Sequence, residues 1–319
     1  MSSERARLLL VSAVVVLVCQ LIGAQSLTYS RGQNVSPAYE GWERNADGSF
    51  SFLFGYMNRN WEEEIDVPVG PDNDIEPGGP DQGQPTHYLP RRNRFIFKVR
   101  VPKDFGQKEM VWTLTTHGKT EKAYATLRTD YLLENVDLMS ETGALGAGTS
   151  NPEVRSDIPP VIRLEGDTSR SVRAGQPLTL VAVVTDDGIP KPRFRGRTNE
   201  QRAADQARAR GDEARGRNPL MIPPTRITVG KVMGLHLSWF VYRGAGKVTI
   251  DPPQIKVWED TRTGANSPWA PFWTPPPLPA DGKWVAQAMF AEPGVYVLRA
   301  RADDGALATD EDVTVTVSR

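Results

Sequence analysis

Two Asp-Asp-Gly motifs are the best candidates for metal binding in this sequence. Asp186 and Asp187 stand in TDDG, and Asp303 and Asp304 stand in ADDG. Calcium takes about six to eight oxygen ligands, and two motifs that end strands of one β-sandwich would lie at the same end. However, Asp-Gly is also the usual pair in tight turns, and the regular D-x-D-x-D-G spacing is absent. We therefore favour two turns, with a calcium site as the alternative.

A basic segment follows the first motif directly. Residues 191–218 carry nine Lys or Arg against four Asp or Glu. Ion pairing within the chain would satisfy the neighbouring carboxylates without a metal, so we expect an arginine between Asp187 and Asp303. The segment lacks the interleaved aromatic residues of nucleic-acid-binding surfaces, and the whole chain is balanced at 38 basic and 39 acidic residues. We predict a solvated arm and no nucleic-acid partner.

A stretch rich in proline and tryptophan, residues 258–284, offers candidate binding rings. Exposed rings on a rigid loop stack on sugars or receive a peptide. Rings that fold back would instead cover a sheet edge, and we favour this interpretation because several exposed tryptophans promote aggregation. The candidate ligand-binding residues are Trp258, Trp269, Phe272 and Trp273.

Catalytic chemistry finds little support in the sequence. His87, His117 and His236 fall in a proline-rich loop, a turn and the outward face of an expected strand, and we expect each at the surface. No G-x-S-x-G, H-E-x-x-H or phosphate-binding glycine loop is present. One acidic loop offers carboxylates of the kind that hydrolyse glycosides, although turn formation is the default role of Asp beside Pro and Gly. Its acidic residues are Asp72, Asp74, Glu76 and Asp81.

The N-terminus reads as an export signal. Arg5 and Arg7 precede an uncharged apolar run, and the small residues at 22–24 are suited to cleavage. We predict a signal peptide over 1–24, with an uncleaved membrane anchor as the alternative because the run has about 17 residues. The only cysteine, Cys19, lies inside this run. The mature chain would therefore lack disulfides, thiol catalysis and cysteine-ligated zinc.

Alternating apolar runs predict the strands that must position these residues. In the first half, strands are expected at 49–57, 94–102, 109–117 and 122–133, with a proline-rich loop at 67–93. In RFIFKVRVP, the alternation sets Phe95, Phe97 and Val99 opposite Ile96, Lys98 and Arg100. We assign residues 25–135 to a β-sandwich-like domain and 136–160 to a linker.

The second half, residues 161–319, alternates in the same way. Apolar side chains share one face over 178–184, 235–241, 296–302 and 313–317, with polar turns between the strands. This spacing predicts a β-sandwich with a basic insertion at 189–228. The fold class is therefore all-β, with two immunoglobulin-like β-sandwiches in tandem.

Three segments of this half carry a family resemblance: AGQPLTLVAVVTDDG, LSWFVYRGAGKVTI and AMFAEPGVYVLRARADDGALATDEDVTVTV. They resemble a polycystic-kidney-disease-type (PKD) or related immunoglobulin-like domain. The resemblance covers roughly residues 160–319, departs from the pattern at 189–228 and 259–282, and specifies no ligand. It implies that Trp239 is a central core ring and that Tyr296 is the tyrosine of a strand corner. The N-terminal part, including GWERNADGSFSFLFGYM, is similar to uncharacterised secreted bacterial proteins, which implies no activity.

The expected function is non-catalytic. We predict an adhesive, scaffolding or ligand-binding module of the bacterial periplasm or cell surface, with a protein or polysaccharide of the envelope as partner and no membrane contact after signal cleavage. One alternative is a polysaccharide-acting hydrolase or its accessory protein. Another is a calcium-stabilised structural spacer. No cofactor is expected apart from the calcium ion of that alternative.

Overall fold

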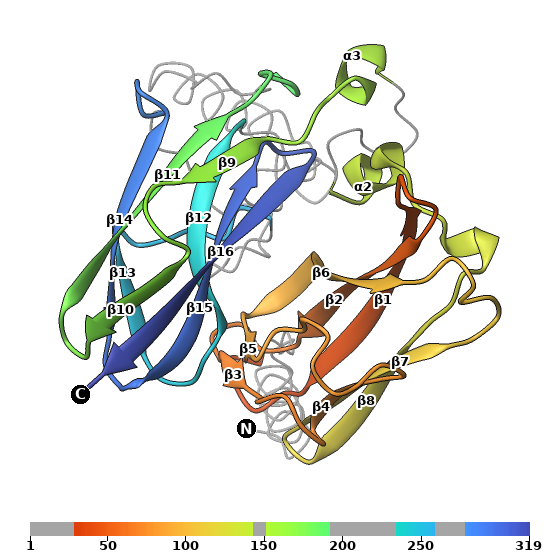
Figure 1. Ribbon diagram of the computed structural model, residues 1–319, viewed down its shortest axis with the longest axis horizontal. Helices are drawn as coiled ribbons and strands as arrows, with labels where there is room; N and C mark the ends of the chain where they lie inside the picture. The colour runs from red at the N-terminus through yellow and green to blue at the C-terminus, as the bar shows by residue number, and fades with distance from the viewer. Residues whose placement is uncertain (1–28, 143–150, 192–233, 259–277) are drawn as a thin grey trace, which may run out of the picture.

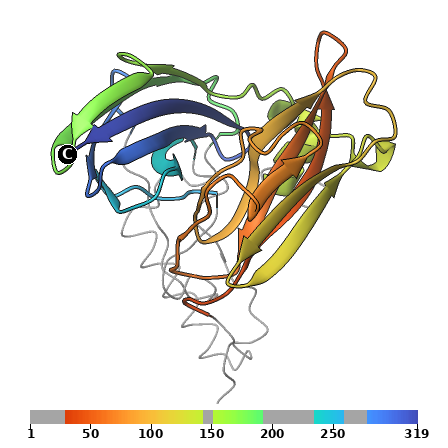
Figure 2. The ribbon, with the colours of Figure 1, turned by 60° about the horizontal axis from the view of Figure 1, so that its bottom comes forward.

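Two β-sandwiches lie side by side in the computed structural model, with short helices at one end of their junction (Figures 1 and 2). The architecture confirms the all-β prediction of two sandwich domains in tandem. The structure describes residues 29–142, 151–191, 234–258 and 278–319. The export signal, most of the basic insertion and three of the candidate binding rings lie outside these ranges. Within them, no helix has the length and apolar character needed to span a bilayer.

The first sandwich consists of the sheets β1-β2-β6 and β4-β7-β8, with a short β3-β5 pair beside them. Its strands are β1 (Val35–Arg44), β2 (Phe50–Asn58), β3 (Ile65–Asp66), β4 (Asn73–Glu76), β5 (His87–Tyr88), β6 (Arg91–Val101), β7 (Met110–Thr116) and β8 (Lys119–Ala125). The tight turn from β7 to β8 consists of His117 and Gly118, both at positive φ. A two-residue hairpin turn needs positive φ at both positions to match the twist of its strands.

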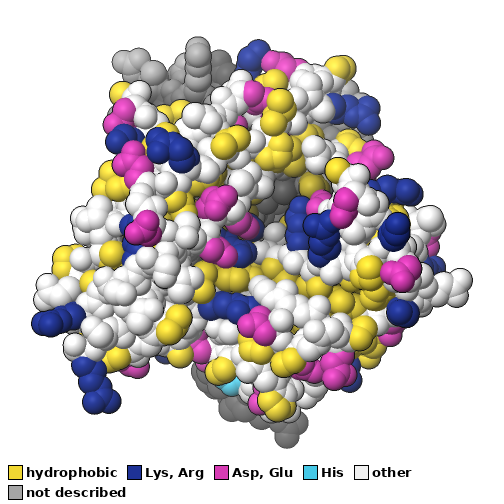
Figure 3. Space-filling view, in the orientation of Figure 1, with side chains coloured by type: hydrophobic (Ala, Val, Ile, Leu, Met, Phe, Trp, Pro, Cys, Tyr) yellow, Lys and Arg dark blue, Asp and Glu magenta, His cyan; other side chains and the backbone are white. Residues whose placement is uncertain are grey.

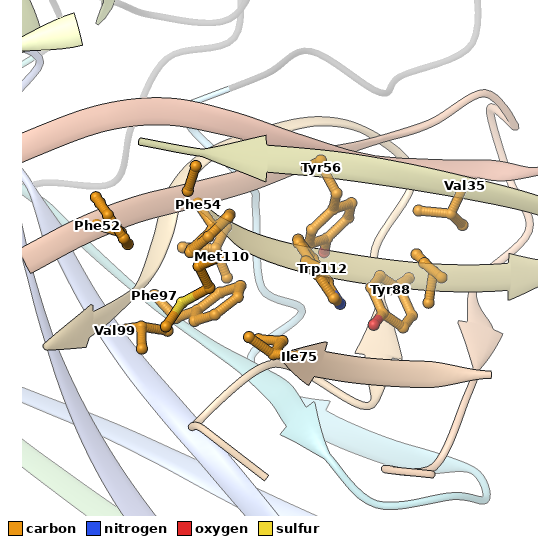
Figure 4. Close-up of a cluster of buried hydrophobic side chains, with 14 of the residues drawn as sticks. Val35, Phe52, Phe54, Tyr56, Ile75, Tyr88, Phe97, Val99, Met110 and Trp112 are labelled. Atoms are coloured by element: carbon orange, nitrogen blue, oxygen red, sulfur yellow. The ribbon is translucent and has the colours of Figure 1, made fainter. Parts of the chain in front are cut away.

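Aromatic rings fill the space between these two sheets (Figure 4). The Phe54 ring from β2 stacks on Phe97 from β6 at a centroid distance of 5.2 Å and meets the Trp112 edge from β7 at 5.9 Å. The Trp112 indole N–H donates to Asn73 Oδ1 at 3.0 Å, so its one polar group is satisfied inside the core. Strands β2, β6 and β7 therefore build one aromatic core.

Buried side-chain amides order the proline-rich loop. Asn73 Nδ2 donates to the carbonyl oxygens of Val67 (3.0 Å) and Pro85 (2.8 Å), and Gln84 Nε2 donates to Asn73 O (3.2 Å). Prolines supply no backbone N–H, so these amides provide the donors that the loop carbonyls need. Strand β4, inside the loop, pairs only with β7 and stands at a sheet edge, where neighbouring prolines are tolerated.

The second sandwich has the sheets β13-β14-β11-β9 and β10-β16-β15-β12, with β10 parallel to β16. Its strands are β9 (Val161–Leu164), β10 (Ser169–Arg173), β11 (Pro177–Thr185), β12 (His236–Arg243), β13 (Val248–Asp251), β14 (Lys283–Phe290), β15 (Gly294–Asp303) and β16 (Ala308–Ser318). Strands β9, β11, β14 and β13 take the places of A, B, E and D of an immunoglobulin sandwich, and β12, β15 and β16 those of C, F and G.

Trp239 and Tyr296 occupy the core of this sandwich. The Trp239 side chain on β12 is buried between the sheets. Tyr296, near the start of β15, donates its hydroxyl to the Glu292 carbonyl at 2.9 Å and packs its ring against Phe290. Gly244 lies against that ring at φ +120°, where a Cβ atom would come within 2.5 Å of Tyr296 Cδ1. The buried ring of Tyr296 therefore requires glycine at position 244 of the Gly-Ala-Gly turn.

Three short helices follow the first sandwich: η1 (Thr129–Tyr131), α2 (Asn135–Thr142) and α3 (Pro152–Arg155). Met139 of α2 and Val154 of α3 pack on Ala306 and Leu307, in the turn between β15 and β16. The Asn151 side chain caps α3 by accepting a hydrogen bond from the Glu153 N–H at 3.0 Å. The segment that was expected to be a linker is thus folded, where described, against one end of the second sandwich.

The face of β12 that the sequence places outward is buried. Phe240 and Tyr242 belong to the same apolar cluster as the core of the first sandwich, and His236 is only 6% exposed. The prediction of a half-exposed strand was wrong here because the first sandwich covers Phe240 and Tyr242, and Trp284 of β14 packs on His236. An alternation of apolar and polar residues identifies one core face but does not show what packs on the other.

The expected alternation of β6 was also wrong near its centre. Phe95 has a positive φ of 52°, and the pairing of β2 with β6 shifts register between Phe54 and Tyr56. Ile96 and Phe97 are both buried as a result. A β-bulge re-aims side chains and backbone in this way, and here it turns the carbonyl groups of residues 95 and 96 toward β15.

Candidate functional site

A groove of about 1030 Å³ lies between the two sandwiches. In Figure 3 it is the hollow near the centre, with basic, acidic and hydrophobic side chains around it. Strand β6 forms one wall and β15 with β16 the other, and α2 contributes at one end. Its charged lining includes Glu43, Arg92, Arg94, Lys98, Glu141, Arg243, Arg299, Arg301, Asp310 and Asp312.

Arg299 joins the two walls of this groove. Its Nε and Nη2 donate to the two carboxylate oxygens of Asp312 at 2.7 and 2.8 Å, and its Nη1 donates to the Ile96 carbonyl at 2.5 Å. The guanidinium carbon lies 3.5 Å from the centre of the Tyr242 ring. A planar guanidinium suits both the paired carboxylate bonds and the ring face. Arg299 therefore links β15, β16, β12 and β6 at one point.

Arg301 repeats the arrangement two residues further along β15. Its Nε and Nη2 donate to the carboxylate of Asp310 at 2.7 and 2.6 Å, and Nη2 also reaches the Phe95 carbonyl at 3.3 Å. The side chain is 5% exposed and stands 5.0 Å from the centre of the Trp258 ring. Buried ion pairs of this kind add little net stability, but losing one partner leaves a costly unpaired charge. These pairs therefore favour one orientation of the two sandwiches.

The proline-rich loop is held against the second sandwich by a further set of bonds. Arg243 donates to both carboxylate oxygens of Asp81 at 2.7 and 3.0 Å and to the Gln84 carbonyl at 2.8 Å. The Tyr242 hydroxyl donates to Gly83 O, and the Thr86 N–H donates to Tyr242 O. One carboxylate of the acidic loop is thus engaged in an interdomain ion pair. Of the other acidic residues there, Asp72 and Glu76 are exposed and Asp74 is half-buried.

Trp258, a candidate ligand-binding ring, is buried at the junction. Its side chain packs with Phe240 at a centroid distance of 5.4 Å, and its indole N–H donates to Asn93 Oδ1 at 3.1 Å. The first sandwich covers the ring, so it presents no face for a sugar, which corrects its candidacy. Trp269, Phe272 and Trp273 lie outside the described residues.

Two of the three histidines are buried, contrary to the prediction of surface positions. His87 lies between Asp66, whose Oδ1 is 2.7 Å from Nδ1, and Glu64, whose Oε2 is 3.2 Å from Nε2. Burial alone would lower the pKa of His87, but the bonds to these two carboxylates outweigh it and raise the pKa to about 9. His236 packs on the edge of Trp284, and burial lowers its pKa to about 4. The pairing of β3 with β5 brings Asp66 opposite His87, which sequence spacing does not reveal.

The four aspartates of the Asp-Asp-Gly motifs each accept backbone hydrogen bonds in their own turns. Asp186 accepts from the Gly188 N–H at 2.9 Å, and Asp187 accepts from the Ile189 N–H at 2.8 Å. Asp303 accepts from the Gly305 N–H (2.8 Å), and Asp304 accepts from the N–H groups of Ala306 (2.6 Å) and Leu307 (2.8 Å). These are Asx turns, the turn chemistry that the sequence favours.

A fifth aspartate, Asp157, stands between the two motifs and was missed. It follows α3 and is 4% exposed, and neither of its carboxylate oxygens accepts a hydrogen bond of ordinary geometry. Burial, with the charges of Asp187 and Asp186, raises its pKa to about 7. In the sequence, the one sign of this residue is an aspartate just before the first strand of the second sandwich. The fold brings that aspartate beside the ends of β11 and β15.

Asp304 is the second deeply buried member of this group. It is 1% exposed, and its Oδ2 has no hydrogen-bond partner. Burial outweighs its two backbone hydrogen bonds and, with the charges of Asp157 and Asp303, raises its pKa to about 8. Across the described ranges, no three acidic or imidazole side chains already meet at metal-ligand distances. The arginine expected between Asp187 and Asp303 belongs to the basic segment, nearly all of which lies outside those ranges.

Strand order, the buried Trp239 and the corner formed by Tyr296 define the second domain as an immunoglobulin-type β-sandwich. No protein-family model matches the chain. No curated protein matches it either.

Among solved structures, the chain is similar to the S-layer protein SbsC, at 9% identity and a TM-score of 0.24 over 90% of this chain, although it spans only 28% of that one. A chimeric titin Z1Z2 gives 10% identity and a TM-score of 0.22, covering 90% of this chain and all of the other. The Down Syndrome Cell Adhesion Molecule gives 9% identity and a TM-score of 0.22, with 89% and 27% covered. Likenesses this weak carry no argument about function.

Proposed function

We propose that this protein is an exported, non-catalytic module that holds two β-sandwiches in one fixed orientation and binds a protein or polysaccharide of the bacterial cell envelope. The observation that carries the proposal is the junction. Neighbouring domains move relative to one another unless their interface is large and apolar. Here Phe240, Tyr242 and Trp258 are buried with the first core, and Arg299 and Arg301 bind carbonyl groups of β6.

The groove between the sandwiches is the surface we assign to the partner. Ligand sites are frequent at domain interfaces. The ion pairs Arg94–Glu141 and Lys98–Glu43 contribute to this groove, and both include partly exposed side chains. A mixed-charge, hydrogen-bonding surface favours a polypeptide or a polar glycan over a lipid.

Export rests on the N-terminal signal pattern, and assignment of the second domain to the PKD type rests on its sequence motifs. Against the hydrolase alternative, Asp81 of the acidic loop is already bound to Arg243.

A sedimentation assay tests the proposed partner class. The purified protein is mixed with insoluble envelope polysaccharide and, separately, with the envelope-protein fraction, and the bound share is measured after centrifugation. We expect saturable binding to one fraction, weakened about tenfold in Lys98→Glu. The control is Lys103→Glu, which changes an exposed lysine beyond the end of β6. Release of soluble sugar from the polysaccharide, or equal binding by both variants, would contradict the proposal.

A further inference from the structure

The aspartates at one end of the second sandwich carry an inference of their own, independent of the proposed partner. Three segments bring them together: the residues after α3, the turn after β11 and the turn between β15 and β16 (Figure 1). The Ile158 N–H donates to Asp187 Oδ2 at 3.2 Å, which joins the first segment to the second. Val154 of α3 packs on Ala306 and Leu307, which places the first segment beside the third.

Burial makes this group different from a set of solvated turn residues. Asp157 is 4% exposed with both oxygens unpartnered, and Asp304 is 1% exposed with one unpartnered oxygen. One oxygen of Asp186 is also buried without a partner. A buried carboxylate that lacks a hydrogen bond or counter-charge is costly, and two or more close together repel one another as well.

The lysine described at this end of the sandwich is already engaged in another ion pair. Lys191, which follows the turn after β11, is bound to Glu153 of α3 at 2.5 Å. Asp303 has an interaction of its own and is left out of the proposed ligand set. The four remaining carboxylates, with the carbonyl groups of three irregular segments, form an oxygen-only ligand set for a hard cation.

We propose that Asp157, Asp186, Asp187 and Asp304 bind a calcium ion that ties the segment after α3 to the end of the second sandwich. Calcium is favoured over magnesium because it accepts six or more oxygens in flexible geometry, whereas magnesium demands a near-ideal octahedron at shorter distances. The carboxylates do not yet meet at ligand distances. The ion therefore draws three loops together, and its binding stabilises the packing of Met139 and Val154 on the β15–β16 turn.

Calcium titration of the EDTA-stripped protein by calorimetry, with a parallel thermal melt, tests this site. We expect one site with a dissociation constant of about 10⁻⁴–10⁻³ M, as in extracellular modules, and a higher melting temperature in calcium. Asp157→Asn should weaken binding at least about tenfold without lowering the melting temperature in EDTA, since it removes a buried charge. The matched control is Asp167→Asn, which changes an exposed aspartate in the turn between β9 and β10.

Each outcome decides the question. Absence of both binding heat and a melting shift in millimolar calcium would overturn the proposal, as would equal calcium affinity in wild type and Asp157→Asn. An equal loss in Asp167→Asn would show a diffuse charge effect and would overturn it too. Should Asp157→Asn fold poorly, Asp304→Asn provides the second variant, because asparagine keeps the oxygen that accepts the two backbone hydrogen bonds.

Discussion

Two groups of aspartates at the second β-sandwich differ in whether their carboxylate oxygens have partners. On β16, Asp310 and Asp312 each bind an arginine of β15 through two hydrogen bonds. At the end of the sandwich, Asp157 and Asp304 are more deeply buried, yet they retain oxygens without a partner. Both groups lie where another part of the chain covers the sandwich.

This difference indicates a different role for each group. A carboxylate paired with a buried guanidinium already has its counter-charge, so its role is to fix the position of that guanidinium. A buried carboxylate without such a partner remains protonated or takes a cation from solution. The first group therefore belongs to the junction between the domains, and the second is the stronger candidate for a ligand site.

The largest effect is expected from breaking the paired group. Arg299→Met leaves Asp312 without its partner and the Ile96 carbonyl without its donor, and we expect it to lower the free energy of unfolding by about 3 kcal/mol. Urea denaturation measures the loss, and small-angle scattering reports whether the two sandwiches separate. Adding Asp312→Leu to Arg299→Met should recover part of the loss. A cost under about 1 kcal/mol would show that the pair does not hold the junction.

His87 offers an intermediate case, a buried cation between two carboxylates. Its folded pKa of about 9 lies above its ordinary value of 6.5, so its contribution is fully present below pH 6.5 and is lost as pH rises through 9. We expect the free energy of unfolding to fall by roughly 3 kcal/mol across that window. Denaturant titrations between pH 6 and 9.5 measure this slope, and His87→Gln should remove it. An unchanged slope in that variant would locate the titrating group elsewhere.

Neutralising a member of the unpaired group should act in the opposite direction. In calcium-free buffer we expect Asp304→Asn to raise the free energy of unfolding at pH 8 by about 1.5 kcal/mol, because a buried charge is removed. The pKa of Asp304, raised to about 8, means that wild-type stability declines as pH rises from about 4 to 8. The charged groups that act on it are Asp157 and Asp303. A destabilised variant in EDTA would mean that Asp304 has a counter-charge after all.

The smallest effect on the free energy of unfolding is expected from removing a neutral hydrogen bond. This loss is the reference against which the effects of the charged groups are compared. Tyr296→Phe removes the bond from the hydroxyl to Glu292 O but keeps the buried ring. We expect a loss of about 1 kcal/mol in thermal or urea unfolding. Tyr131→Phe, at a ring that is 42% exposed, is the matched control and should change little. Equal effects of the two substitutions would mean that the corner hydrogen bond adds nothing measurable.

Local patterns predicted much of the second sandwich. Tyr296, Leu298, Ala300 and Ala302 alternate along β15, and each is completely buried on the core face. The turn chemistry of the Asp-Asp-Gly motifs was equally predictable, because an aspartate two residues before a glycine accepts a hydrogen bond from the glycine N–H. Such features depend on neighbours in sequence, which a single chain displays directly.

The candidate sites were harder to predict because their partners come from distant segments. His87 meets Asp66 across a two-stranded pair, and Trp258 meets Asn93 across the domain junction. Asp157 lies in a stretch without a regular apolar pattern, so nothing local marked it as buried. In each case the side chain was visible in the sequence, but its environment was not.

The sequence by itself determined the all-β class, the core faces of the strands of the second sandwich and the corner at Tyr296, since alternation and turn residues act over a few positions. Only the tertiary structure decided that the outer face of β12 would be covered, that Arg299 and Arg301 would bind the bulge of β6, and that Asp157 would join two distant turns. The physical reason is that burial of a second face and pairing of a charge depend on surfaces brought together by folding.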